Sequence, residues 1–123
     1  MISPIYIKIV SFICLIKTQI EFILFEFKDL TTSRDVKYSN WSASDVSKFC
    51  RYIEKISNFL GIESCFIKSL TKRKFLKNKG FDCKLYIGIS NESVFKSHCW
   101  LICEEINCYE EPEEDLKIIR IID

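Results

Sequence analysis

The hydrophobic and polar positions of the chain fall into blocks, and each block predicts one kind of structure. Residues 5–27 are mostly apolar and predict an N-terminal helix, either amphipathic or fully buried, that packs on the domain or on a partner. Residues 28–40 are polar and predict a linker. From residue 41 onward the pattern is periodic, first with helical and then with strand spacing. The order of elements is therefore helices first and strands afterwards.

Two helices are predicted after the linker. Ser42 and Asp45 have the spacing of a helix-capping pair, in which each side chain accepts a hydrogen bond from an early backbone N–H. The residues that follow repeat an apolar position at helical spacing, at Val46, Phe49, Cys50, Ile53, Ile56 and Leu60. Gly61 is the expected end of this helix, and a second helix, 65–79, is expected to end at Gly80.

Four strands are predicted in the second half of the chain, where apolar and polar residues alternate. They cover 83–89, 97–103, 106–109 and 116–122. Helices followed by a meander of strands predict the α+β class with an antiparallel sheet. We therefore expect a single domain over residues 1–123, with its core in residues 41–123.

Composition and charge exclude some classes of function. The 123 residues suffice for one domain with a hydrophobic core, and the 48% apolar and 28% charged residues are ordinary for a folded protein. A net charge of +1 gives no overall field that would attract nucleic acid. We therefore interpret the Lys- and Arg-rich segment 72–79 as the solvated side of a helix rather than as a phosphate-binding face.

The apolar N-terminal stretch does not predict a membrane span. Its longest uncharged run, Ile9–Ile16, has eight residues, whereas a span needs ~20. A basic start and a small-residue cleavage site, which would mark a secretory signal, are not evident. We expect a cytoplasmic protein, with peripheral membrane contact through residues 5–27 as the lesser alternative.

Seven cysteines are an odd number, so a complete set of internal disulfides is excluded. They are expected to be free thiols in a reducing compartment, where cysteine serves as a small apolar residue. Cys99, Cys103 and Cys108 have a loosely metal-like spacing. On a strand, however, Cys99 and Cys103 share one face and His98 points to the other, and no tight pair of cysteines is present. We expect no metal site.

Cys65 and His98 are the candidates for chemistry. Cys65 is the first residue of a predicted helix, where unpaired N–H groups and the helix dipole favour a thiolate. His98 is the only histidine and lies on a predicted strand, where it would accept the thiol proton as a general base. The alternative is that one is a buried cysteine among seven and the other a hydrogen-bonded histidine beside Trp100. A thiol catalyst of the papain or transglutaminase type has this layout of helix, strand and acid.

A third group would hold the imidazole in one tautomer. Asn107, Glu110 and Glu111 follow the histidine strand and are the candidates, and spacing does not choose among them. The alternative is a solvated acidic turn, because five carboxylates lie between Glu110 and Asp115.

Four motifs resemble the transglutaminase-like leader peptidases of lasso-peptide biosynthesis. They are Cys65-Phe-Ile-Lys-Ser-Leu, Lys-Phe-Leu-Lys-Asn-Lys-Gly80, Leu85-Tyr-Ile-Gly-Ile89 and Ser97-His-Cys-Trp100. The family carries Cys-Leu-x-x-Ser-Leu, Leu-Arg-x-x-Gly, Leu-x-Ile-Gly-Val and Ala-His-Ala-Trp-Val-Glu at the corresponding places. The resemblance covers residues 42–111. This chain departs from it with Cys99 for alanine, Ile102 for glutamate and Glu110 for the family's aspartate.

The resemblance implies a papain/transglutaminase-like fold, in which the nucleophile helix packs on an antiparallel sheet. It implies that Cys65, His98 and Glu110 form the catalytic set of a cysteine protease that removes the leader from a ribosomally made lasso-peptide precursor. A separate small leader-recognition protein would present the precursor, and an ATP-dependent macrolactam cyclase would act on the product. The chemistry needs no cofactor. The alternatives are a papain-fold amidase or acyltransferase and a non-catalytic peptide-binding scaffold.

Overall fold

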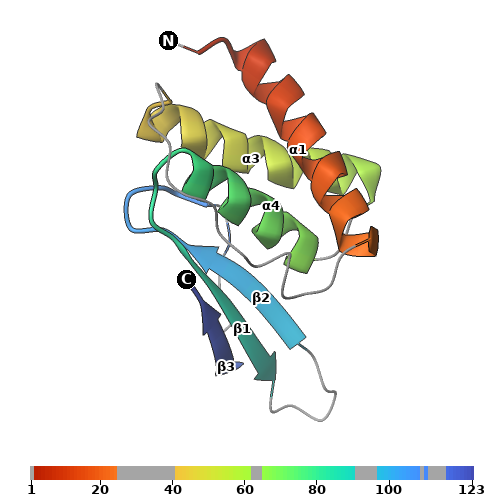
Figure 1. Ribbon diagram of the computed structural model, residues 1–123, viewed down its shortest axis with the longest axis vertical. Coiled ribbons are helices and arrows are strands. Elements are labelled where there is room, and N and C mark those ends of the chain that lie inside the picture. Colours follow the sequence, from red (N-terminus) through yellow and green to blue (C-terminus); the bar gives the residue numbers. More distant parts are fainter. Residues whose placement is uncertain (1, 25–40, 62–64, 91–96, 109, 111–115) are drawn as a thin grey trace.

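The computed structural model describes residues 2–24, 41–61, 65–90, 97–108, 110 and 116–123, and in them it has three helices and one three-stranded sheet (Figure 1). The helices are α1 (Pro4–Leu24), α3 (Ala43–Leu60) and α4 (Cys65–Asn78). The strands are β1 (Lys84–Ser90), β2 (Ser97–Ile102) and β3 (Leu116–Ile122). Helices precede strands and the strands are antiparallel, so the predicted α+β class is confirmed. The predicted linker, 28–40, lies outside the described residues.

Both predicted ends of α3 are confirmed. The Ser42 hydroxyl accepts a hydrogen bond from the Asp45 backbone N–H at 3.2 Å, and the Asp45 carboxylate accepts one from the Ser42 backbone N–H at 3.2 Å. Gly61 follows the helix with φ of 72°, in the left-handed region that favours glycine, and its N–H donates to the carbonyl of Asn58. Reciprocal capping at one end and a left-handed stop at the other fix the length of the helix.

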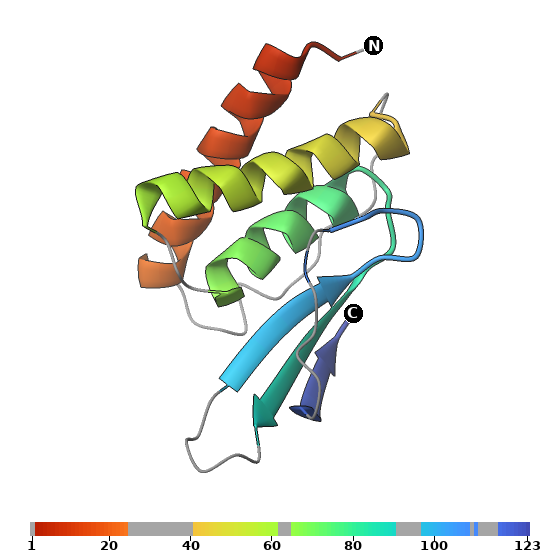
Figure 2. The same cartoon turned by 180° about the vertical axis from the view of Figure 1, so that it is seen from behind.

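The helix α4 lies between the other two helices and the sheet (Figures 1 and 2). Its Phe75 ring stacks on Phe49 of α3, with ring centroids 3.8 Å apart, and meets Trp41 edge-on at 4.9 Å. Buried aromatic pairs of this kind add to the free energy of apolar burial. They hold α4 in register with α3, while the opposite side of α4 contacts β1 and β2.

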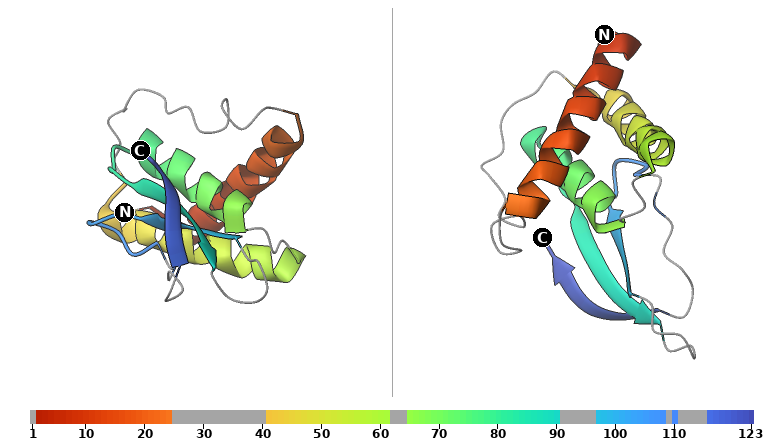
Figure 3. Two further views of the ribbon diagram at one scale, coloured as in Figure 1. Left: turned by 90° about the horizontal axis from the view of Figure 1, so that it is seen from below. Right: turned by 90° about the vertical axis from the view of Figure 1, so that its right-hand side faces the viewer.

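The helix α1 buries only one face. Ile7 and Leu15 lie in the core, and the small residues Ser11 and Thr18 on the same face let the helix approach α3 and α4 closely. Six large apolar side chains of the helix are exposed, at Ile5, Tyr6, Ile9, Phe12, Ile13 and Ile20. The helix is thus amphipathic only in part, and it crosses the helix pair at a steep angle (Figure 3). No helix within the described ranges is both long and apolar enough to span a membrane.

The sheet has the strand order β2-β1-β3, so the predicted meander is wrong. β3 passes β2 and pairs with the far side of β1, where the register shifts between Ile87 and Gly88. Residues 106–108, part of a predicted strand, form no strand, and Tyr109 lies outside the described residues. The physical reason is a contact with α4, because the Cys108 carbonyl accepts a hydrogen bond from Lys72 Nζ at 2.7 Å. That bond keeps the segment beside the helix and out of the sheet.

The basic segment of α4 is not the solvated face that its charges suggested. Lys72 and Arg73 are 0% and 1% exposed. Arg73 donates to the backbone carbonyl of Asp123, and Lys74 pairs with Glu21 of α1. These cations therefore connect α4 to other elements through buried or half-buried contacts. Neither a solvated side nor a phosphate-binding face describes them.

Candidate active site

Cys65 is the first residue of α4, and its side chain is half-buried. The start of a helix presents backbone N–H groups without intrahelical partners and the positive end of the helix dipole. The strand β2 packs against the same helix. Cys65 therefore stands where α4 meets the sheet, with part of its thiol open to solvent.

A second cysteine forms a hydrogen bond with this thiol. Cys99, on β2, donates its S–H to Cys65, and the two sulfur atoms are 3.4 Å apart. Cys99 itself is 5% exposed and faces α4 together with Leu101. The site is thus a pair of thiols, one half-open and one enclosed.

The environment lowers the pKa of Cys65 from the ordinary thiol value to about 5. The largest cause is the hydrogen bond from Cys99, and partial burial opposes it. The backbone N–H of Cys99 and the imidazole of His98 lower the pKa further, the imidazole by its charge and by a hydrogen bond. The pKa of Cys99 is raised, because it donates to Cys65 and is buried. These contacts therefore favour the thiolate form of Cys65 over the thiol.

His98 lies on β2 opposite Gly88 of β1. Its imidazole stacks on Trp100 with centroids 5.9 Å apart, and Trp100 stacks on Tyr86 at 5.7 Å. His98 and Cys99 are neighbours on a strand, yet both act on Cys65. β2 is an edge strand of the described sheet, so no described strand lies beyond it on that side. The structure thus brings together Cys65 and His98, the two residues with predicted chemical roles.

Glu110 is buried beside this pair, but its described contacts go elsewhere. Its carboxylate accepts hydrogen bonds from the Ser69 hydroxyl and the Leu101 backbone N–H, each at 2.5 Å. Lys72 Nζ lies 3.6 Å from the same carboxylate. Burial raises the pKa of Glu110, while Lys72 and the two hydrogen bonds lower it. Among the described contacts of Glu110, none is with His98.

The contacts of Glu110 connect the two elements that carry the candidate pair. Ser69 is one turn beyond Cys65 on α4, and Leu101 is three residues beyond His98 on β2. A single carboxylate therefore fixes the helix against the edge strand. Its predicted part in orienting the imidazole stays a prediction. Asn107 is exposed, and Glu111 lies outside the described residues.

Lys72 completes a buried polar network under the site. Its ammonium donates to Glu54 Oε1 of α3 and to the Cys108 carbonyl, each at 2.7 Å. Sequence reasoning missed Ser69, Lys72 and Cys99. A signal was present for the first two, because residues 65, 69 and 72 are spaced by four and three and so share one face of a helix.

A second thiol pair lies in the core and was also missed. Cys50 of α3 and Cys108 hydrogen-bond through their side chains, and the pKa of Cys50 is raised by that bond and by burial. Of the three cysteines with a loosely metal-like spacing, Cys103 and Cys108 are neighbours, whereas Cys99 pairs with Cys65. Within the described ranges no group of three or more His, Cys, Asp or Glu side chains could hold a metal ion.

Comparison with known families identifies the fold of this chain. The model of the transglutaminase-like superfamily matches residues 17–122, which include most of the chain. The chain belongs to the transglutaminase-like superfamily. No curated protein and no solved structure gives a significant match.

Membership of the transglutaminase-like superfamily confirms the predicted fold class and supports the fold of papain-like cysteine proteases and acyltransferases. The matched residues contain α3, α4 and β1–β3 up to Ile122. Cys65 at the start of α4 and His98 on β2 both lie inside the match. Superfamily membership by itself does not specify substrate or reaction.

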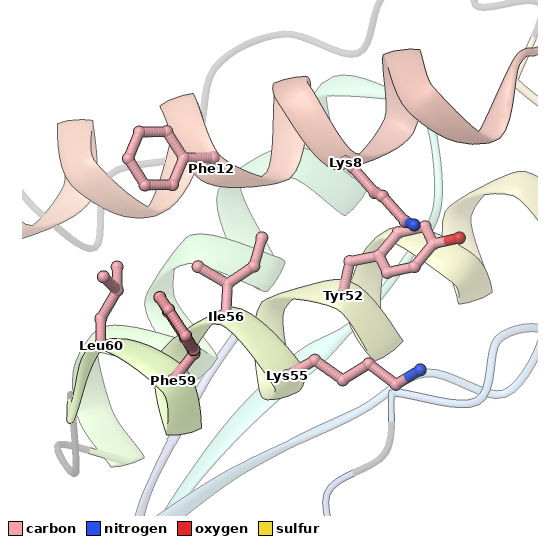
Figure 4. A pocket seen from close by; sticks show the side chains of 7 residues that line it. All are labelled: Lys8, Phe12, Tyr52, Lys55, Ile56, Phe59 and Leu60. Carbon is pink, nitrogen blue, oxygen red and sulfur yellow. The ribbon is translucent and has the colours of Figure 1, made fainter.

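A cavity of about 340 Å³ lies between α1 and α3 (Figure 4). Its wall is mostly apolar, Phe59 is 89% exposed, and the Lys8 ammonium lies 5.3 Å from the centre of the Tyr52 ring. The lining residues are Lys8, Phe12, Tyr52, Lys55, Ile56, Phe59 and Leu60. None of the candidate catalytic residues lines this cavity, so it is separate from the thiol site.

Proposed function

We propose that this protein is a cysteine peptidase that removes the leader from a lasso-peptide precursor. One observation carries the proposal: the half-open Cys65, at the start of α4, has its pKa lowered to about 5 by Cys99 and His98. A thiol in this state is the nucleophile that an acyl-transfer reaction requires. The lasso-peptide specificity rests on the resemblance of the motifs around Cys65 and His98.

In the proposed mechanism the Cys65 thiolate attacks the scissile carbonyl of the precursor. The backbone N–H of Cys65 is the proposed donor to the oxyanion, because it belongs to the unpaired first turn of α4. The His98 imidazolium gives a proton to the departing amine, which leaves an acyl-enzyme. His98 then takes a proton from water, and the hydroxide formed releases the leader and restores the thiolate.

Glu110 also has a positioning role in this mechanism, besides the orientation of the imidazole that the family's aspartate suggests. Its contacts with Ser69 and Leu101 support a positioning role, in which the carboxylate holds α4 and β2 at the separation that Cys65 and His98 need. Glu110, Asn107 and Glu111 all stay candidates for orienting the imidazole. Replacing each in turn, with cleavage rate and unfolding measured together, separates orientation of His98 from support of the fold.

The proposed substrate is a precursor peptide, presented in the cytoplasm by a separate small leader-recognition protein. An ATP-dependent macrolactam cyclase would use the freed core peptide. The proposed chemistry needs no metal and no organic cofactor, because the nucleophile, the base and water supply every proton and every bond. These partners follow from the resemblance.

The test is cleavage of a precursor encoded beside this gene, with the recognition protein present, followed by mass spectrometry. The wild-type chain should release two fragments that sum to the precursor plus water. Cys65→Ala and His98→Ala should each lower the rate by at least about a thousandfold, because loss of nucleophile or base leaves only binding. Cys14→Ser, which removes a thiol of α1 away from the pair, is the matched control and should retain activity.

Three results would distinguish the alternatives. A folded Cys65→Ala variant that still cleaves excludes the proposed nucleophile. An intact peptide heavier by about one mass unit indicates an amidase, because deamidation exchanges an amide NH₂ for OH without chain cleavage. Binding of the precursor without any product indicates the peptide-binding scaffold, for which the apolar cavity between α1 and α3 is the supporting observation.

A further inference from the structure

The pair Cys65 and Cys99 has a chemistry of its own besides acyl transfer. The two sulfur atoms are 3.4 Å apart in their reduced state, and a disulfide would bring them to about 2.05 Å. The two thiols belong to α4 and β2, which pack against each other. Closing this gap therefore requires an approach of roughly 1.4 Å between two elements that are already in contact.

Access to the two sulfurs is unequal, and this decides which of them reacts first. Cys65 is half-open at the helix start, whereas Cys99 is 5% exposed. A small oxidant therefore reaches Cys65 and not Cys99. The positive end of the helix dipole and the lowered pKa of Cys65 favour the thiolate, which is the form that peroxides oxidise.

We propose that Cys65 is a site of reversible oxidation by hydroperoxides and that Cys99 is its resolving thiol, so that the two close into a disulfide. The inference goes beyond the proposed peptidase function and does not depend on it. It uses only the proximity of two thiols and their unequal access. If Cys65 is also the peptidase nucleophile, the disulfide form is inactive.

The reaction balances in two steps. The Cys65 thiolate attacks one oxygen of hydrogen peroxide, the O–O bond breaks, and the departing hydroxide takes a proton to form water, leaving a sulfenic acid. The Cys99 sulfur then attacks the Cys65 sulfur, the S–O bond breaks, and the oxygen leaves as a second water with the Cys99 proton. Two thiols are oxidised by two electrons and one peroxide is reduced.

The same environment favours return to the reduced state. A reduced form that contains a stabilised thiolate is lower in energy, which weakens the corresponding disulfide. The hydrogen bond from Cys99 and the imidazole of His98 stabilise the Cys65 thiolate in this way. The disulfide should therefore be reduced readily by a dithiol such as dithiothreitol. Without Cys99, Cys65 would continue along the oxidation ladder to sulfinic acid, which thiols do not reverse.

The experiment uses the full chain, fully reduced, freed of reductant and treated with one equivalent of hydrogen peroxide. Remaining thiols are alkylated and the protein is digested and analysed by mass spectrometry. Before alkylation the intact wild type should be about two mass units lighter than the reduced protein, the digest should contain one linked peptide joining Cys65 to Cys99, and dithiothreitol should remove the link. In Cys99→Ser and Cys99→Ala the link should vanish, and sulfinic acid at Cys65 should rise by about tenfold.

The control Cys14→Ser removes a half-buried thiol outside the pair and should form the link as the wild type does. Sulfinic acid at Cys65 in the wild type, without a linked peptide, would overturn the proposal. Preferred linkage of Cys65 to any other cysteine would do the same. The readout is mass and needs no substrate, so a chain that forms the disulfide but cleaves no precursor contradicts only the peptidase proposal.

Discussion

The two hydrogen-bonded thiol pairs, Cys65 with Cys99 and Cys50 with Cys108, differ in their surroundings more than in their chemistry. In each pair one thiol donates to the other, and the pKa of the donor is raised while that of the acceptor is lowered. Cys50 and Cys108 are 0% and 5% exposed in the core. Cys65 is half-open at the start of a helix, with a histidine beside it. A lowered pKa therefore marks a reactive site only where reagents can reach the sulfur.

The largest expected difference between the two pairs is in their rates of alkylation by iodoacetamide at neutral pH. Cys65 should react at least about a thousandfold faster than Cys50 or Cys108, because the core pair is exposed only when the structure opens. Mass spectrometry of peptides sampled over time measures the three rates. Equal, slow labelling of all seven cysteines would remove the contrast between the pairs and favour the non-catalytic scaffold.

Lys72 bonds to the Cys108 carbonyl and pairs with Glu110, which holds α4 against β2, so its loss should disturb the fold around both pairs. Lys72→Met leaves Glu110 and Glu54 without their shared cation and should lower the free energy of unfolding by about 3 kcal/mol. Urea titration followed by circular dichroism measures the change. Lys68→Met is the matched control, because Lys68 pairs with Glu54 at 3.2 Å but is partly exposed, and it should cost about 0.5 kcal/mol. Equal losses for the two variants would mean that burial of Lys72 contributes nothing.

The dependence of the alkylation rate on pH should show how far Cys99 lowers the pKa of Cys65. Only the thiolate reacts, so the rate at Cys65 should fall as pH drops through about 5. Cys99→Ala removes the donor, which raises the pKa of Cys65, so the fall should begin at higher pH and the rate at pH 6 should drop by about tenfold.

The matched control for this prediction is Cys50→Ala, which removes the donor of the core pair. It should leave the pH profile of Cys65 unchanged, because Cys50 does not act on Cys65. A Cys99→Ala profile that superimposes on the wild-type profile would assign the lowered pKa to the helix start and His98 alone.

Local signals in the sequence predicted much of the fold. The capping pair Ser42 and Asp45, the stop at Gly61 and the alternation in the strands all depend on neighbours within a few residues, and they were predicted correctly. The placement of Cys65 at a helix start and of His98 on a strand had the same origin.

The incorrect predictions concern contacts between segments that are far apart in the sequence. Alternation identifies β3 but does not say that it pairs with β1, and the apolar residues of 106–108 read as a strand although Lys72 holds them against α4. The burial of Lys72 needs Glu54 and Glu110, which lie 18 and 38 residues away in sequence and become neighbours only in the folded chain. The approach of Cys99 to Cys65 likewise depends on how α4 sits on β2, which no single segment encodes.

The buried ammonium of Lys72 joins separate segments of the chain, as a structural metal ion does in many small domains. It donates hydrogen bonds to Glu54 of α3 and to the Cys108 carbonyl, and it pairs with the Glu110 carboxylate at 3.6 Å. Such a cross-link assembles with the chain itself and is indifferent to chelators. Arginine would not replace Lys72, because a guanidinium is larger and planar and would not fit the same enclosed position.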